Sequence, residues 1–392
     1  PHDPRHTALV GEDLPVTGGA PVRDPAPLDG APRPDGFGAW YDANVRAQRQ
    51  EGYCVVTVHL PIGDLTSQQA RGLADIARRF AGDNLRTTVD QNIVLRFVSG
   101  ADLPTVYAAL GEIGLAQPGA GTIVDVTACP GTDTCKLGIA SSRGLAGELR
   151  TRLAAKSASL DQAVSELSIK ISGCFNSCAQ HHIADIGFYG NARGFDGRRV
   201  PHFQVVLGGQ RHDNAAKYGK AVGAVPSKHA PAVVDVLTDA YVHGRRPTEK
   251  FQQWADRMGK RELRTLLEPF MTGPSFEEAP DFYTDFSDAR QYTVGDLGVG
   301  ECAGEVVSLF GIEVVKAESE VFDAQVALDE DDDPDAAEDH AYRAMLFAAR
   351  ALVRTEFIDV TEDPDDIVAE WKTRLFDTER FFDRFAKGKF GR

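Results

Sequence analysis

The chain has 392 residues, of which 42% are hydrophobic and 26% charged, a composition typical of a globular protein with two or three hydrophobic cores. Six cysteines are too few for a disulfide scaffold, and the sequence contains no run of about eighteen apolar residues that could span a membrane. The N-terminal sequence PHDPRHTALV lacks the apolar core of a signal peptide, so we predict a cytoplasmic protein without a membrane partner.

The net charge of −16 is unevenly distributed along the chain. Residues 273–392 contain 30 acidic and 12 basic side chains, so residues 1–272 are close to neutral. An acidic C-terminal region on a near-neutral body gives no sign of nucleic-acid binding.

Residues 1–36 contain eight of the 21 prolines and little apolar periodicity. This composition predicts a linker or a wrapping arm. Residue 1 is proline rather than methionine, which suggests that translation starts upstream of the printed sequence.

Residues 37–115 are predicted to form a ferredoxin-like half-domain. Thr66 and Gln69 have the spacing of a capping box at the start of a helix, and Asp102 is expected to cap the next helix. The apolar periodicities predict strands at 53–60, 85–89, 92–98 and 122–126, and helices at 67–80 and 102–113. This β-α-β-β-α-β order is the split βαβ arrangement, a scaffold that implies no function by itself.

Residues 116–272 are predicted to form an α/β domain. Its strands are expected at 167–172, 183–189 and 202–208, and its helices at 144–156, 230–243 and 248–267.

Residues 273–304 are predicted to be an irregular linker, and residues 305–392 an acidic helical domain. Pro334, within the acidic run 329–335, should separate the first two helices because proline stops a helix. The expected helices lie near 305–328, 335–356 and 364–386. The predicted fold class is therefore α+β, ending in a small helical bundle.

Four of the six cysteines lie in two loops that each follow a predicted strand. Cys129 and Cys135, in TACPGTDTCKLG, have five residues between them, and Cys174 and Cys178, in KISGCFNSCAQHH, have three. Strand ends leave backbone N–H groups available, and four thiolates in such a setting can hold an iron–sulfur cluster.

Three glycines in these loops, Gly131, Gly138 and Gly173, should let the backbone approach closely without Cβ clashes. Structural zinc is the main alternative, although zinc sites usually keep two to four residues between paired ligands. Unconnected buried cysteines are a second alternative, and disulfides are the least expected. Cys54 and Cys302 stand apart and are expected to be buried or free thiols.

At these cysteines the sequence resembles the nitrite and sulfite reductase family, whose signature is a Cys-x5-Cys loop followed by Gly-Cys-x-Asn-x-Cys. Here 38 residues separate Cys135 from Cys174, and the second motif is GCFNSC. The resemblance covers about residues 36–270 and includes TTVDQNIVLRFV and HFQVVLGGQ.

The resemblance implies two cofactors, a 4Fe-4S cluster and siroheme. Gln91 and Asn92 would hydrogen-bond to siroheme carboxylates, unless they only form a hairpin turn. Lys136 would neutralise the same carboxylates, unless it is a solvated surface lysine, and Asn176 would orient the second loop or contact siroheme. Cys178 would also be the axial ligand of the siroheme iron. The implied cluster ligands are Cys129, Cys135, Cys174 and Cys178.

His181 and His182 follow the second motif and resemble metal ligands. The cluster already has four ligands, so we expect both histidines to be structural.

The implied activity is six-electron reduction of sulfite to sulfide, with electrons from ferredoxin or a similar donor. Reduction of nitrite to ammonium is the alternative, and either substrate is a small inorganic anion. Members of the family have two copies of the half-domain and siroheme-domain pair, whereas this chain has one. We therefore expect a C-terminal part of a longer polypeptide, or a chain that pairs with a separate N-terminal half.

The missing half would supply most of the cations that bind the anion, and we identify no substrate-binding residues here. Two alternative hypotheses assign the chain to other functional classes: a non-catalytic cofactor-binding half-module, and a zinc-stabilised regulatory module.

Overall fold

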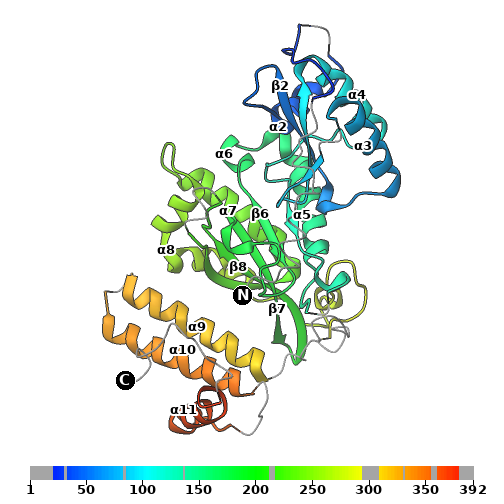
Figure 1. Ribbon diagram of the computed structural model, residues 1–392. Helices are drawn as coiled ribbons and strands as arrows, with labels where there is room; N and C mark the ends of the chain where they lie inside the picture. The colour runs from blue at the N-terminus through cyan, green and yellow to red at the C-terminus, as the bar shows by residue number, and fades with distance from the viewer. Residues whose placement is uncertain are drawn as a thin grey trace. The chain divides into compact units, whose positions relative to one another are not determined.

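Figure 1 shows the computed structural model of the chain, which forms two compact units. Unit 1 consists of Pro1–Cys129 and Arg143–Ile171, and unit 2 of Pro130–Ser142 and Ser172–Arg392. The structure describes residues 21–30, 33–82, 85–135, 137–211, 217–293, 309–329, 332–354 and 360–378.

Unit 1 contains a four-stranded antiparallel sheet in the order β1-β2-β4-β3, covered by helices. Its core includes Val56, Leu73 and Leu95, all of which are buried. The strands are β1 (Val45–Ala47), β2 (Tyr53–Val58), β3 (Leu85–Thr87) and β4 (Ile93–Ser99), and the helices are α2 (Phe37–Asn44), α3 (Ser67–Phe80) and α4 (Leu103–Glu112).

The capping box predicted at the start of α3 is confirmed. The Thr66 hydroxyl accepts from the Gln69 N–H (3.2 Å), and the Gln69 amide oxygen accepts from the Thr66 N–H (3.0 Å). Asp102 is the N-cap residue immediately before α4, but its side chain makes no capping hydrogen bond, so that prediction is wrong. Its carboxylate lies 3.7 Å from the Arg23 guanidinium instead.

The strand predicted at 122–126 is also wrong, because that segment consists of turns. The Thr122 N–H donates to the Gly119 carbonyl (3.1 Å), and the Asp125 N–H donates to the Thr122 carbonyl (2.9 Å). The outer strand next to β2 is instead β1, whose three residues are too few to show an alternating pattern.

The rest of unit 1 contains a short parallel strand pair. Strand β5 (Thr127–Ala128) pairs with β6 (Ile169–Ser172) through Thr127 opposite Lys170 and Ala128 opposite Ile171. The connecting helices are α5 (Ser142–Lys156) and α6 (Gln162–Ser165).

Unit 2 contains an antiparallel meander of β7 (Ile186–Phe195), β8 (Arg198–Leu207) and β9 (Lys220–Pro226). Asp196 and Gly197 form a two-residue turn between β7 and β8, both with positive φ, which is a strong hairpin signal. Helices α7 (Ala230–Gly244) and α8 (Phe251–Leu267) follow, near the predicted positions.

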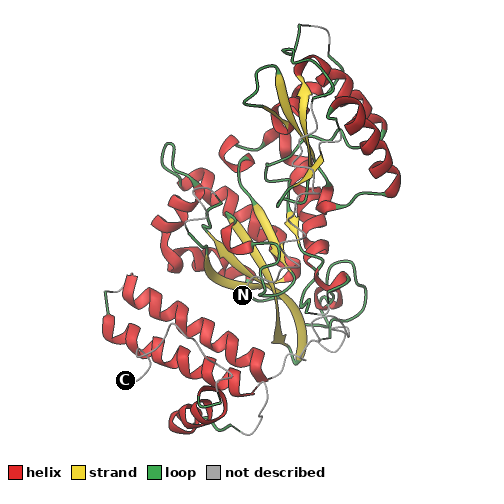
Figure 2. Ribbon diagram, viewed as in Figure 1, coloured by secondary structure: helices red, strands yellow, loops and turns green. Residues whose placement is uncertain are grey.

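The last part of unit 2 is helical, as the sequence predicts (Figure 2). Pro334 begins the second helix of this part, which confirms the separation expected from the acidic run. Buried Glu313 on the first helix accepts from Arg354 on the second (2.8 Å). The helices are α9 (Leu309–Asp329), α10 (Pro334–Arg354) and α11 (Pro364–Trp371).

Along the ranges described above, none of the helices combines the length and the apolar character needed to cross a membrane.

Candidate functional site

The two cysteine loops begin where the parallel strands β5 and β6 end. Cys129 directly follows β5, and its N–H donates to the Ile171 carbonyl (3.1 Å). Gly173 directly follows β6. Because neighbouring parallel strands end at the same edge, the first cysteine loop (residues 129–141) and the second (residues 173–180) both start at this edge.

Within unit 2 the two loops are joined by backbone hydrogen bonds. The Ile139 N–H (2.7 Å) and the Ala140 N–H (3.1 Å) both donate to the Gly173 carbonyl. The start of the second loop is therefore fixed to the end of the first.

Glycines make this close approach possible. A Cβ on Gly138 would lie 2.6 Å from the Gly131 carbonyl carbon, and a Cβ on Gly173 would lie 2.6 Å from the Gly131 Cα. Gly131 has φ +56, a left-handed conformation that favours glycine. The close backbone approach predicted for these three residues is confirmed: Gly138 and Gly173 approach Gly131, and a Cβ on Gly131 would lie 2.9 Å from the Ser142 nitrogen.

The second loop is held mainly by Ser172 and His181. The Ser172 hydroxyl accepts from the Ala179 N–H (3.3 Å) and lies 2.9 Å from His181 Nδ1. His181 is 0% exposed, and within the described part of the chain its Nε2 has no hydrogen-bond partner. Burial, with a smaller contribution from nearby His182, lowers the pKa of His181 to about 3, so the ring is neutral at physiological pH. This arrangement supports the structural role expected for His181.

The four thiols differ in exposure. Cys129 and Cys174 are buried, Cys135 is half-buried and Cys178 is exposed. Phe175, in the same loop, is 52% exposed. The later part of the second loop, which also contains Asn176, therefore presents an apolar ring and a thiol at the surface.

These observations test whether the residues suit a 4Fe-4S cluster. Across the described ranges, no three His, Cys, Asp or Glu side chains are gathered as ligands of a single metal ion. A 4Fe-4S cluster takes one thiolate on each of its four irons. An all-thiol donor set on two joined loops fits such a cluster.

Gln91 holds the strand that precedes Cys129. Its amide nitrogen donates to the Ala128 carbonyl (2.7 Å), and its amide oxygen accepts from the Ala128 N–H (3.2 Å). Close by, buried Lys170 on β6 forms an ion pair with Asp90 (3.0 Å). The turn that contains Gln91 thus contacts both β5 and β6.

Asn92 is buried and also bonded within unit 1. Its amide nitrogen donates to Asp125 Oδ2 (2.8 Å), and its amide oxygen accepts from the Leu60 N–H (2.8 Å). Both polar atoms of Gln91 and of Asn92 therefore have protein partners, and contact of either residue with siroheme stays a prediction. Lys136 lies outside the described residues.

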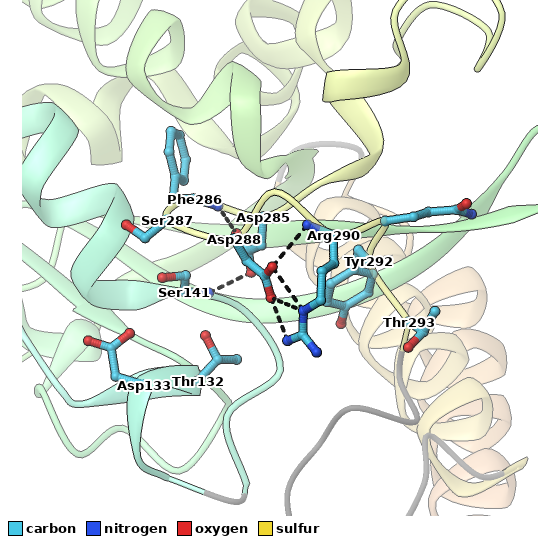
Figure 3. A pocket seen from close by; sticks show the side chains of 11 residues that line it. Thr132, Asp133, Ser141, Asp285, Phe286, Ser287, Asp288, Arg290, Tyr292 and Thr293 are labelled. Carbon is cyan, nitrogen blue, oxygen red and sulfur yellow. Dashed lines mark hydrogen bonds and ion pairs between the residues drawn. The ribbon is translucent and has the colours of Figure 1, made fainter.

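Residues 284–293 contact the first loop, although they belong to the region that was expected to be an irregular linker. The Ser141 N–H donates to Asp285 Oδ2 (2.7 Å), and the Tyr292 hydroxyl donates to the Ile139 carbonyl (2.7 Å). Burial raises the pKa of Asp285 to about 6. Thr132 lies across a cavity of about 250 Å³ from this segment (Figure 3).

Two family models match the chain. The nitrite/sulfite reductase ferredoxin-like half domain matches residues 46–113, and the nitrite and sulphite reductase 4Fe-4S domain matches residues 119–273. The second match contains all four cysteines of the two loops.

Several curated proteins are similar to the chain. Sulfite reductase (ferredoxin) 1 of Mycolicibacterium paratuberculosis is 32% identical over 209 residues, which cover 52% of this chain and 37% of that protein. Ferredoxin–nitrite reductase of Synechococcus elongatus is 30% identical over 193 residues, with coverages of 49% and 37%. The chain thus spans less than half the length of these relatives.

A solved structure of the Mycobacterium tuberculosis NirA protein is also similar, with a TM-score of 0.51 and 28% identity over 62% of this chain and 43% of that one. The two family models describe consecutive segments and together cover more than half of the chain. The chain therefore belongs to the nitrite and sulfite reductase family.

Proposed function

We propose that this chain is the cofactor-binding part of a siroheme-dependent reductase that takes sulfite to sulfide in a six-electron reaction. The main structural support is the pair of cysteine loops that start at one edge of β5 and β6 and are joined at the Gly173 carbonyl. Such a strand-end setting suits a cluster whose negative charge is stabilised by backbone N–H groups.

Cys129, Cys135, Cys174 and Cys178 are the proposed cluster ligands, and Cys178 is also the proposed axial ligand of siroheme. The cluster and the macrocycle would supply single-electron transfer to a substrate that needs six electrons. Cys178 suits the shared position because its thiol is the most exposed of the four and lies beside exposed Phe175. Asn176, exposed on the same loop, is the proposed polar contact of the macrocycle. Lys136 is proposed to neutralise siroheme carboxylates.

Gln91 and Asn92 have a different proposed role, in addition to any contact with siroheme. Their amides are bonded to Ala128, Asp125 and Leu60. We propose that they hold the end of β5 in place, so that Cys129 is presented in a constant position.

Ferredoxin is the proposed electron donor, because the names of the relatives include ferredoxin. Reduction of nitrite to ammonium is the second candidate, since a nitrite reductase is among those relatives. A missing N-terminal half is the proposed source of the cations that bind the anion. Without that half, the chain would be a cofactor-binding module with little activity, and the cytoplasm is its proposed location.

The test is the absorption spectrum, with iron and acid-labile sulfide analysis, of the chain purified anaerobically from cells that make siroheme. Macrocycle bands with about five irons per chain are expected, about four from the cluster and one from siroheme. Cys174→Ser should lose the cluster, whereas Cys54→Ser should keep it, because Cys54 lies on β2. A colourless wild-type chain that contains zinc would refute the proposal.

A further inference from the structure

We infer that residues 284–293, the strap, hold the first cysteine loop in the conformation that binds the cluster, with Asp285 and Tyr292 as positioning residues. This inference rests on the proposed cluster. The strap begins beyond residue 273, where the match to the 4Fe-4S domain model ends.

The strap contacts the part of the loop that lies between Cys135 and α5. Inside the loop, the Cys135 N–H donates to the Gly131 carbonyl (2.9 Å), and the Gly138 N–H donates to the Cys135 carbonyl (3.1 Å). These bonds fix the turn around Cys135 but do not involve the polar groups of Ile139 and Ser141 that the strap binds.

Tyr292 supplies the first contact, from 153 positions along the chain. Its hydroxyl donates to the Ile139 carbonyl at 2.7 Å. The N–H of Ile139 donates to the Gly173 carbonyl, so this peptide segment is held from two sides. A shift of Ile139 would break both of its bonds and leave only the Ala140 N–H to bind the Gly173 carbonyl among the bonds described here.

Asp285 supplies the second contact. It is 6% exposed, and its Oδ2 accepts from the Ser141 N–H at 2.7 Å while Oδ1 accepts from the Phe286 N–H at 2.8 Å. Ser141 belongs to the first cysteine loop, so the carboxylate holds the backbone of that loop directly. Figure 3 shows Asp285 bonded to both backbone groups.

The strap is closed by hydrogen bonds and an ion pair of its own. The Tyr292 N–H donates to the Tyr283 carbonyl (2.7 Å), and Thr284 forms a bridge with Gln291. Arg290 pairs with Asp288 across the turn (2.7 Å). Asp285 and Tyr292 therefore lie on a closed, hairpin-like turn. This turn holds both side chains in place against the first cysteine loop.

The first experiment compares Tyr292→Phe with Tyr283→Phe in the full 392-residue chain carrying its cluster. Each variant removes one hydroxyl that donates to a backbone carbonyl, but Tyr283 donates to Pro274 (3.1 Å), away from the cysteine loops. The measurement is the rate of iron release to the chelator bathophenanthroline. One hydrogen bond in the ligand loop should change this rate about threefold to tenfold for Tyr292→Phe, with little change for Tyr283→Phe.

The second experiment compares Asp285→Ala and Asp285→Asn. Alanine removes the acceptor for Ser141, whereas asparagine keeps one oxygen that can accept that bond, so its release rate should lie between those of the wild type and Asp285→Ala. Asp196→Ala is the matched control, because Asp196 accepts from a distant backbone N–H, that of Phe276 (3.2 Å), without touching the loops.

Faster iron release in Tyr292→Phe and Asp285→Ala than in their controls supports the inference. Equal rates in Tyr292→Phe and Tyr283→Phe overturn it.

If the wild-type chain holds no iron, the proposed function fails. Hydrogen exchange of residues 137–141 then tests the strap alone. Faster exchange in Tyr292→Phe supports the inference, and unchanged exchange overturns it. If Asp285→Ala does not fold, Asp285→Asn and Tyr292→Phe decide by the same comparison.

Discussion

Apart from the bonds that join the two loops at the Gly173 carbonyl, the first cysteine loop is held by a segment far along the chain, whereas the second is held at its far end by residues close to it in sequence. Ile139 and Ser141 in the first loop bind to Tyr292 and Asp285. In the second loop, the hydrogen bonds of Ser172 reach only as far as His181.

This difference suggests different tasks for the two loops. The later part of the first loop is held from two sides, by Gly173 and by residues 284–293, which suits a rigid support for cluster ligands. The second loop is fixed at its two ends, while Phe175 and Cys178 between them are exposed. Exposure at that point is what a shared ligand between cluster and macrocycle would need, since the macrocycle must reach the thiol.

The largest expected effect comes from separating the loops at the Gly173 carbonyl. A Cβ on Gly190 would lie 2.1 Å from that oxygen, and backbone on both sides leaves no flexible group that could move. We expect Gly190→Ala to lower the free energy of unfolding by about 3 kcal/mol or more, measured by urea denaturation.

Gly194 is the control, because it lies on the same strand, β7, and a Cβ there would meet nothing within 4 Å. Gly194→Ala should leave stability nearly unchanged. If the two alanine variants are equally stable, close packing at the Gly173 carbonyl does not hold the two loops together.

A smaller effect is expected at Asn92, which supports the strand before the first loop. Asn92→Ala removes the acceptor of the buried Leu60 N–H and a donor to Asp125. Leaving buried polar groups without partners should cost about 2–3 kcal/mol of unfolding free energy.

Asn176→Ala sharpens this comparison, because the same residue type is exposed on the second loop. We expect less than about 0.5 kcal/mol loss of stability from it, but lower siroheme content measured by absorption. The reverse pattern, a stable Asn92→Ala and an unstable Asn176→Ala, would contradict the assignment of supporting and exposed residues.

Local patterns predicted much of the fold and the cysteine motifs. The capping box of Thr66 and Gln69 and the close approach at Gly131 depend on a few adjacent residues, and both are seen in the structure. The sequence suggested that glycines permit a close contact, but not that Gly138 and Gly173 would make it with Gly131.

Contacts between distant positions could not be predicted in this way. Asp285 and Ser141 are 144 positions apart, and nothing in the residues around either one indicates the other. Strand β9 was missed for another reason: its small residues are buried on successive positions, so no alternation of polar and apolar residues appears.

The last predicted effect concerns the internal support of the second loop and is a pH dependence. Buried His181 is neutral in the folded chain because its pKa is lowered to about 3, whereas in the unfolded chain it takes up a proton near pH 6.5. The unfolded state therefore binds more protons at low pH, and this contribution to stability is lost as pH falls below about 6.5. Between pH 7 and pH 5 the loss should be about 2 kcal/mol.

His181→Gln should remove this part of the pH dependence, whatever its effect on stability at pH 7. His243→Gln is the control, because His243 lies exposed in the last turn of α7. Urea denaturation of the wild type, His181→Gln and His243→Gln at pH 7 and pH 5 gives, for each protein, the loss of unfolding free energy on acidification. An equal loss on acidification in the wild type and in His181→Gln would mean that the second loop does not depend on a neutral ring at position 181.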